Sequence, residues 1–508
     1  MMWLLPLSFA LAASLADGER CLAANDVICA QAEVSELGAE SSGDPKTLLF
    51  AARSAFFMGE HERAAELAGA ARRAGYVEQY DELSRIEATA AATEGWNKVE
   101  RGIWKAAWAP GLDAVLVEDA IDTVKMAEAA YAPVLGKGPP GGTVVELFPD
   151  PGSFTEASGL PRMAIETTGV VAISKWSRLL VMSPRTRALG YGWRDTVAHE
   201  YVHLVVAHHT EDRAPVWLQE AIAKYLDNRW RDGRDNFRLG VRQQSLLAEG
   251  LANESLVPFE KMHPSLALLD SQEEAALAYA QLASLMDYCF QTRGERVLLG
   301  VLPRVKKGED ARDALAGEMN AQDFDSLIED WKAWVSGRGL IARRLGELNP
   351  VLAGGDVEDV DPVLAGREDL AGFVRLGDLL MERERPEAAL VEYTKALDPD
   401  DPHSPLLANR LAEVYLVLGR NKEARAALEQ SLVDYPEFGL THKTLGRILL
   451  DEGRIAAARD SFRAAVEINP FDPELQQHLL ETSRALGDDA RASRYERQLE
   501  ILRRGGEG

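Results

Sequence analysis

Residues 199–203 read His-Glu-Tyr-Val-His, a spacing that suits chemistry at a metal ion. On a helix, positions i and i+4 lie on one face, so the imidazoles of His199 and His203 can reach one metal ion. Glu200 lies beside that face, where its carboxylate can hold a metal-bound water and take its proton. The flanking runs, Thr-Val-Ala before and Leu-Val-Val-Ala after, predict a helix, and they fit the alternative of two histidines on a solvated helix face less well.

A catalytic zinc ion needs a third protein ligand and one open position, and two residues compete for that role. His209 follows His199 at the metzincin spacing, but that class has a glycine where this chain has Val206. Glu220 follows Pro215, which can begin a second helix. Two antiparallel helices would turn the Glu220 carboxylate towards the histidines, so we predict that Zn²⁺ is held by His199, His203 and Glu220.

These two motifs resemble those of a known family. The run Thr-Val-Ala-His-Glu-Tyr-Val-His at residues 196–203, followed by Trp-Leu-Gln-Glu at residues 217–220, is similar to the peptidase MA-like family of gluzincin zinc peptidases. The second motif of that family usually continues with Gly, where this chain has Ala221. The resemblance covers about residues 96–337, and members of the family often carry helical repeats on the same chain.

The resemblance implies a mechanism and further residues. Glu200 would take the proton of the zinc-bound water and later deliver it to the leaving amine. Related gluzincins use a downstream Tyr or His as a second donor to the oxyanion, and Tyr279 is the candidate here, with a core aromatic as its alternative role. Some gluzincins orient a zinc-binding histidine with an Asp at the position of Lys224, so Asp195 and Asp227 are the remaining candidates.

A small sheet and a set of helices must position these residues. Residues 143–148, 169–173 and 179–182 are rich in β-branched and aliphatic side chains and predict strands. Residues 189–335 have mostly helical spacing. The predicted fold class is an α+β zincin-like metallopeptidase domain, flanked by all-α helical repeats. Residues 179–182 would form either an edge strand that pairs with an extended substrate or an ordinary interior strand.

The C-terminal part of the chain is an internal repeat. Four kinds of residue recur at or near a 34-residue spacing. They are small residues (Gly377, Ala412 and Gly446), turn glycines (Gly419, Gly453 and Gly487), large core residues (Tyr393, Leu428 and Phe462) and closing prolines (Pro399, Pro436 and Pro470). This pattern resembles the tetratricopeptide repeat. Stacked helix pairs of that kind present a concave groove, so we expect the repeats to bind a protein or peptide partner.

Composition narrows the classes of function. A chain of 508 residues, 46% of them apolar, is too long for one core. Its 81 acidic and 56 basic residues give a net charge of -25, which argues against nucleic acid or an anionic membrane surface as the main partner. Cys21 and Cys29 lie close together, either as a disulfide or as two unpaired thiols. Cys289 lies in an apolar stretch and is predicted to be buried.

The N-terminus has the features of a targeting segment. Residues 3–15 form an apolar run of signal-peptide length, too short to span a bilayer and without the small-residue box of a lipid anchor. We therefore expect an exported protein, periplasmic or extracellular, with no membrane anchor. The predicted divisions are a signal peptide at residues 1–16, a flexible leader at 17–44, a helical hairpin at 45–95, a metallopeptidase domain at 96–337, a linker at 338–366 and repeats at 367–505.

Together these features predict an exported zinc metallopeptidase that hydrolyses peptide bonds, with repeats that recruit a peptide or protein. One alternative is a repeat-based scaffold with an inactive metallopeptidase-like domain. Another is a zinc hydrolase acting on non-protein amides such as cell-wall crosslinks. The presence of Glu200 favours the two enzymes over the scaffold, because a purely structural zinc site needs no general base.

Overall fold

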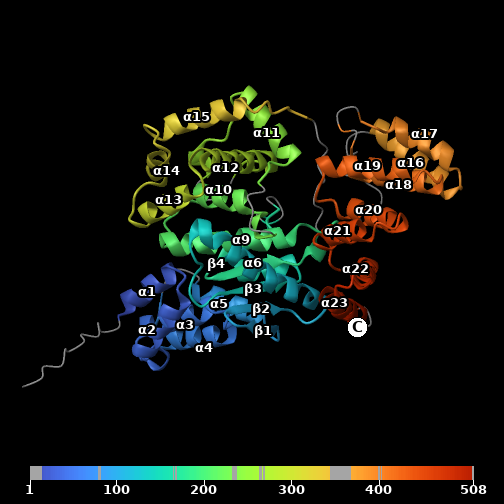
Figure 1. The fold of residues 1–508 in the computed structure, drawn as a ribbon. Coiled ribbons are helices and arrows are strands. Elements are labelled where there is room, and N and C mark those ends of the chain that lie inside the picture. Colours follow the sequence, from blue (N-terminus) through green and yellow to red (C-terminus); the bar gives the residue numbers. More distant parts are fainter. Residues whose placement is uncertain are drawn as a thin grey trace, which may run out of the picture.

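The computed structural model describes residues 14–77, 82–163, 165, 169–231, 237–262, 266, 269–343, 368–398, 401 and 403–505. Most of the predicted signal peptide and most of the predicted linker lie outside these residues. N-terminal helices are followed by a mixed sheet with its own helices and then by C-terminal helix pairs (Figure 1). This architecture confirms the predicted fold class.

The N-terminal helices form one packed unit. They are α1 (Leu15–Ala23), α2 (Val27–Glu36), η1 (Ala39–Ser41), α3 (Pro45–Phe57), α4 (His61–Arg73) and α5 (Glu82–Ala92). The prediction of a flexible leader at residues 17–44 is wrong, because this segment is largely helical. Leu22 is buried together with Phe50 of α3, and the Cys21–Cys29 disulfide joins α1 to α2. Burial of apolar side chains against α3, a partner distant in sequence, stabilises helices that are too short to persist alone.

A five-stranded sheet lies at the centre of the next part of the chain. Its strands are β1 (Asn97–Arg101), β2 (Trp104–Trp108), β3 (Thr143–Phe148), β4 (Ala172–Lys175) and β5 (Arg178–Met182), in the order β1-β2-β3-β5-β4. The central pairs β2–β3 and β3–β5 are parallel, while β1–β2 and β4–β5 are antiparallel. Residues 179–182 are therefore interior, and the edge strand of this end of the sheet is β4.

The two faces of the sheet have different coverings. Alternate side chains of β3 and β5, such as Val145 and Leu179, join a core with α6 (Val117–Leu135) and α9 (Trp193–Thr210). The side chains between them, such as Phe148 and Leu180, pack with α7 (Pro151–Ser158) on the opposite face. Both strands are fully buried, which explains why they read as continuous apolar runs in the sequence.

A buried ion cluster connects α4 to the sheet. His61 Nε2 lies 2.5 Å from Glu146 Oε1, and Arg178 donates to Glu146 Oε2 at 2.6 Å. Although burial raises the pKa of Glu146, Arg178 and His61 outweigh it and lower that pKa to about 2. The carboxylate is therefore charged at neutral pH and pairs with Arg178 inside the sheet. Burial lowers the pKa of His61, so α4 is joined to the sheet by the hydrogen bond of a neutral imidazole to Glu146.

Helices follow α9 and complete this part of the protein. They are α10 (Val216–Leu226), α11 (Val241–Ala252), α12 (Gln272–Arg293), α13 (Arg296–Lys306), α14 (Ala311–Met319) and α15 (Phe324–Ser336), with the short turns η4 (Arg229–Arg231) and η5 (Phe259–Met262) among them. Two further short turns, η2 (Leu112–Leu116) and η3 (Pro184–Thr186), precede α9. Helix α10 packs against both α9 and α12. Cys289 on α12 is a buried free thiol, as predicted. No helix within the described ranges is long and apolar enough to cross a membrane.

The C-terminal helices form successive antiparallel pairs. They are α16 (Glu368–Glu382), α17 (Pro386–Lys395), α18 (Pro405–Val417), α19 (Asn421–Asp434), α20 (Gly439–Asp451), α21 (Ile455–Val466), α22 (Pro473–Ala485) and α23 (Asp489–Gly505). The small residues of the repeat allow close packing within each pair. A Cβ atom added at Gly446 would lie 2.5 Å from the ring of Phe462, and one at Gly377 would lie 2.3 Å from the ring of Tyr393.

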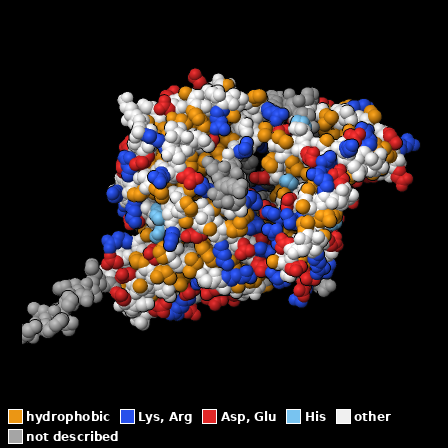
Figure 2. Space-filling view, viewed as in Figure 1, with side chains coloured by type: hydrophobic (Ala, Val, Ile, Leu, Met, Phe, Trp, Pro, Cys, Tyr) orange, Lys and Arg blue, Asp and Glu red, His pale blue; other side chains and the backbone are white. Residues whose placement is uncertain are grey.

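The helix pairs are docked onto the sheet-containing part (Figure 1). Arg494 of α23 pairs with Asp119 and Asp122 of α6, at 3.0 and 2.9 Å. The backbone N–H of Tyr191, just before α9, donates to the carbonyl of Ile468 at 3.2 Å. Figure 2 shows a hollow between this part and the repeats, with basic side chains gathered along the junction. The repeats are therefore fixed beside α9 by several separate contacts.

Candidate metal centre

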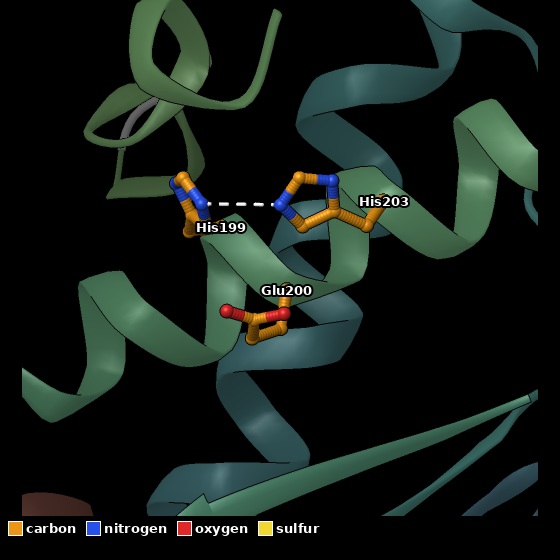
Figure 3. Close-up of side chains that lie close together, drawn as sticks. All are labelled: His199, Glu200 and His203. Carbon is orange, nitrogen blue, oxygen red and sulfur yellow. Dashed lines mark hydrogen bonds between the residues drawn. The ribbon is translucent and has the colours of Figure 1, made fainter. Parts of the chain in front are cut away.

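Helix α9 brings the three residues of the first motif together. The Nε2 atoms of His199 and His203 are 3.2 Å apart, and the donor atoms of His199, Glu200 and His203 all lie within 4.8 Å of one another. Figure 3 shows the two imidazoles facing each other, with Glu200 on an adjacent side of the helix. This helix ends at Glu211, whose backbone is left-handed with φ of 50°, and the break lets the chain return as α10.

Helix α10 adds Glu220 to this cluster. Its Oε2 atom lies 3.2 Å from His199 Nε2 and 3.7 Å from His203 Nε2. The same oxygen is buried and forms no hydrogen bond within the described residues. Pro215 stands immediately before α10, where the break between the two helices was predicted. The structure therefore brings His199, His203 and Glu220 to one point from two helices.

His209 lies outside the cluster. Its Nε2 atom is 2.8 Å from the carbonyl oxygen of Lys137, and the neighbouring His208 Nδ1 is 2.7 Å from the carbonyl of Ala24. Each imidazole at this end of α9 is thus engaged with the backbone of another segment. Of the two residues considered for the third position, Glu220 therefore lies beside His199 and His203, and His209 does not.

Asp227 orients one of the histidines. Its Oδ1 atom is 2.7 Å from His199 Nδ1, and its Oδ2 atom accepts a hydrogen bond from Lys224 Nζ at 3.0 Å. Burial raises the pKa of Asp227, but Lys224 and His199 lower it more, so the carboxylate is ionised and accepts. With a cation bound, His199 would keep its proton on Nδ1, towards Asp227, and would present the Nε2 lone pair to the cation. Of the two sequence candidates, Asp195 instead accepts from Trp230 Nε1 at 2.7 Å.

Replacing Asp227 by Asn should weaken zinc binding about 10–100-fold, because His199 would lose the carboxylate that sets its tautomer and orientation. The measurement is the zinc dissociation constant by competition with a chromophoric chelator. The control is Asp325→Asn, which alters an exposed acid in the first turn of α15. Equal affinities for both variants would contradict the role assigned to Asp227.

Glu200 and Tyr279 complete the polar groups around the cluster. Burial raises the pKa of Glu200, opposed by His203 and His199, and this brings its carboxyl closer to the range of a working base. Burial, Glu220 and Glu200 all raise the pKa of Tyr279 on α12, so its hydroxyl keeps its proton. Lys224 Nζ lies 5.4 Å from the centre of the Tyr279 ring. Tyr279 thus stands beside the cluster as a half-buried side chain.

Models of two known protein families match this chain. The family model of the Peptidase MA superfamily matches residues 162–337. The chain contains a Peptidase MA superfamily domain. Tetratricopeptide repeat models match residues 374–437 and 409–473, so the helix pairs from α16 to α21 are tetratricopeptide repeats. Both resemblances seen in the sequence are confirmed.

Curated relatives match a limited part of the chain. DnaJ homolog subfamily C member 3 of Rattus norvegicus is 29% identical over 141 residues, which is 27% of this chain and 27% of the relative. The Homo sapiens protein of the same name is 28% identical over 141 residues, with the same coverage. The chain therefore spans about a quarter of the length of these relatives.

Solved structures of repeat proteins are also similar to parts of the chain. The Sgt2 tetratricopeptide repeat domain of Aspergillus fumigatus has 21% sequence identity and a TM-score of 0.22, with 25% of this chain and 83% of that one covered. PilF of Pseudomonas aeruginosa has 16% identity and a TM-score of 0.25, with 44% and 93% covered.

The donor set of the Peptidase MA domain fits a zinc ion. Two imidazole nitrogens and one carboxylate oxygen are a ligand set of catalytic zinc, which keeps one further position for water or substrate. Glu220 Oε2 is buried and has no hydrogen bond among the described residues. This also fits a metal site, because a bound cation would satisfy the oxygen. His199, His203 and Glu220 could therefore hold zinc, with Glu200 left over as a base.

Proposed function

We propose that this protein is a zinc-dependent metallopeptidase. The observation that carries the proposal is the convergence of His199, His203 and Glu220 from two helices, with the Glu200 carboxylate beside them. Zinc held there would supply a Lewis acid that polarises the scissile carbonyl and makes water more acidic. A site that served structure alone would have no use for a fourth, acid–base group at this position.

Glu200, Tyr279 and Asp227 would carry out the other parts of the reaction. Glu200 takes a proton from the attacking water and delivers it to the nitrogen of the leaving amine, so that one carboxyl serves as base and then as acid. Tyr279 donates its hydroxyl proton in a hydrogen bond to the oxygen of the scissile carbonyl as negative charge develops there. Asp227 keeps His199 in the tautomer that presents Nε2.

Strand β4 provides a place for an extended substrate. It is the last strand in the sheet order and packs against α9. An edge strand can pair with an extended peptide through main-chain hydrogen bonds. We therefore assign the pairing role to residues 172–175 and not to residues 179–182, and a linear, unfolded peptide is the kind of substrate that can be bound in this way.

Export and partner binding are further parts of the proposal. The apolar N-terminal run and the Cys21–Cys29 disulfide both suit an oxidising compartment outside the cytoplasm. The tetratricopeptide repeats would recruit a protein or peptide through their concave groove. Because the repeats are docked beside α9, a recruited chain would be held close to the Peptidase MA domain.

The purified, zinc-loaded chain should hydrolyse unfolded casein and lose that activity when a chelator removes the metal. Restored zinc should restore the activity, because the ligands themselves are not altered by chelation. Peptidoglycan fragments are tested beside casein. Cleavage of these fragments alone would favour the hydrolase of non-protein amides, and no hydrolysis of either by zinc-loaded protein would leave the repeat-based scaffold.

A further inference from the structure

A cavity of about 390 Å³ opens beside the metal centre on the side of His203. Gln219, the neighbour of Glu220, also lines it, so the cavity is continuous with the proposed reaction site. Its volume falls within the range of pockets that bind small ligands, roughly 300–1,000 Å³. It is therefore large enough to receive a side chain of a substrate bound at the metal centre.

One wall of this cavity comes from outside the Peptidase MA domain. Leu22, Ala23 and Phe57 belong to α1 and α3, whereas the family match begins at residue 162. The opposite wall is formed by Leu204 and Ala207 of α9 and by Trp176 of the β4–β5 turn. The family resemblance alone therefore does not account for this cavity, which exists only because the N-terminal helices are docked here.

The N-terminal wall is held in place at several points. The Asn25 side-chain oxygen accepts hydrogen bonds from Ser177 N at 3.0 Å and from Ser177 Oγ at 2.9 Å, and both residues are buried. The carbonyl oxygen of Ala24 lies 2.7 Å from His208 Nδ1 on α9. The disulfide of Cys21 closes the loop between α1 and α2. This wall is thus a fixed part of the cavity.

The charges around the cavity are balanced. Arg53 is paired with Glu19 and also with Glu82, the latter at 2.9 Å. Lys175 lies with its Nζ atom 4.4 Å from the centre of the Trp176 ring. The charged lining residues are Glu19, Asp212, Arg53 and Lys175, two of each sign, and the uncharged polar ones are Asn25, Ser174, His203 and Gln219. The other six are apolar and include the large side chains of Leu22, Phe57, Trp176 and Leu204. Because the charges balance, the large apolar side chains are the part of this mixed lining that can cover an uncharged, apolar group.

We propose that the N-terminal helices and α9 together form a specificity pocket for a large apolar side chain of the substrate, next to the bond that is cleaved. This inference rests on the proposed peptidase function and adds its substrate class, peptides with an aromatic or long aliphatic residue at one position beside the scissile bond. The N-terminal helices are then part of the substrate-binding surface and not a separate module.

The test fills the cavity by Ala23→Trp. Ala23 is exposed at the end of α1, so the larger side chain can be accommodated by the fold. The probes are quenched fluorescent peptides that carry either Phe or Ala beside the cleaved bond. The ratio of kcat/KM for the Phe peptide to that for the Ala peptide should fall at least about tenfold in the variant. The matched control is Ala32→Trp, an exposed position on α2 outside the cavity, which should keep the wild-type ratio.

A binding measurement separates this inference from the proposed function. Fluorescence anisotropy of the labelled peptides is measured with the zinc-loaded Glu200→Gln protein, with and without Ala23→Trp. Tighter binding of the Phe peptide that disappears with Ala23→Trp supports the pocket, even if the wild-type protein hydrolyses nothing. Hydrolysis by the wild type with a Phe-to-Ala ratio equal in the wild type and both tryptophan variants overturns the pocket and leaves the peptidase proposal intact.

Discussion

Replacing Glu200 by Gln should lower kcat for peptide hydrolysis by about 10³-fold or more, because Gln cannot take the proton of the attacking water. The zinc content should stay at about one ion per chain, since the three ligands are unchanged. Gln has nearly the same size and shape as Glu, so the packing of α9 is preserved. The two measurements are zinc by atomic emission and initial rates on a fluorescent peptide that the wild-type protein cleaves.

Glu211→Gln is the matched control for this experiment. Glu211 directly follows α9 and pairs with Lys306 at 3.3 Å, away from the cluster of donor atoms. Its substitution should change kcat by less than about twofold, as is usual for surface positions. A Glu200→Gln protein that keeps its zinc and hydrolyses peptides at the wild-type rate would refute the assignment of Glu200 as the general base.

Removing the Glu220 carboxylate by Glu220→Ala should weaken zinc binding by more than about 100-fold. The loss should exceed that caused by removing an outer hydrogen-bond partner, about 10–100-fold, because a direct ligand disappears. Only His199 and His203 would remain, and two imidazoles do not complete the protein ligand set of a catalytic zinc site. The affinity is measured by chelator competition, with circular dichroism as the check that α10 still folds.

His209→Ala is the contrasting variant. The His209 imidazole lies against the carbonyl of Lys137 and not within the cluster, so its loss should leave zinc affinity within about threefold of the wild type. Zinc lost with His209→Ala and kept with Glu220→Ala would reverse the assignment and indicate a third histidine ligand. Zinc lost with both would show that the end of α9 also supports the metal site.

The three parts of the chain meet around α9. The N-terminal helices contact its end through His208, the sheet packs along it, and the repeats contact the residues just before it through Tyr191. A mutation in either flanking part can therefore change the metal centre or its approach without touching a ligand. This arrangement is why the proposed specificity pocket is tested in the full chain.

Much of the metal centre could be predicted from the sequence, because the information is local. The helical period alone places His199 and His203 on one face. A break marked by Pro215, twelve residues after His203, is enough to suggest that a second helix brings Glu220 back towards them. The repeats are equally local, since the small residue at Gly446 and the ring of Phe462 recur at a fixed interval that each helix pair needs for packing.

Other features depend on contacts between distant segments and were decided only by the tertiary structure. Residues 17–44 look like a loop by composition, yet burial against Phe50 makes them helical. Strand order is a property of pairing, so the sequence left open whether residues 179–182 lie at the edge, and the structure puts β4 there. Asp227 could only be guessed as the partner of His199, because nothing in its neighbours marks a hydrogen bond across 28 residues. Local periodicity is encoded within a few turns of chain, whereas such contacts exist only when the whole core has packed.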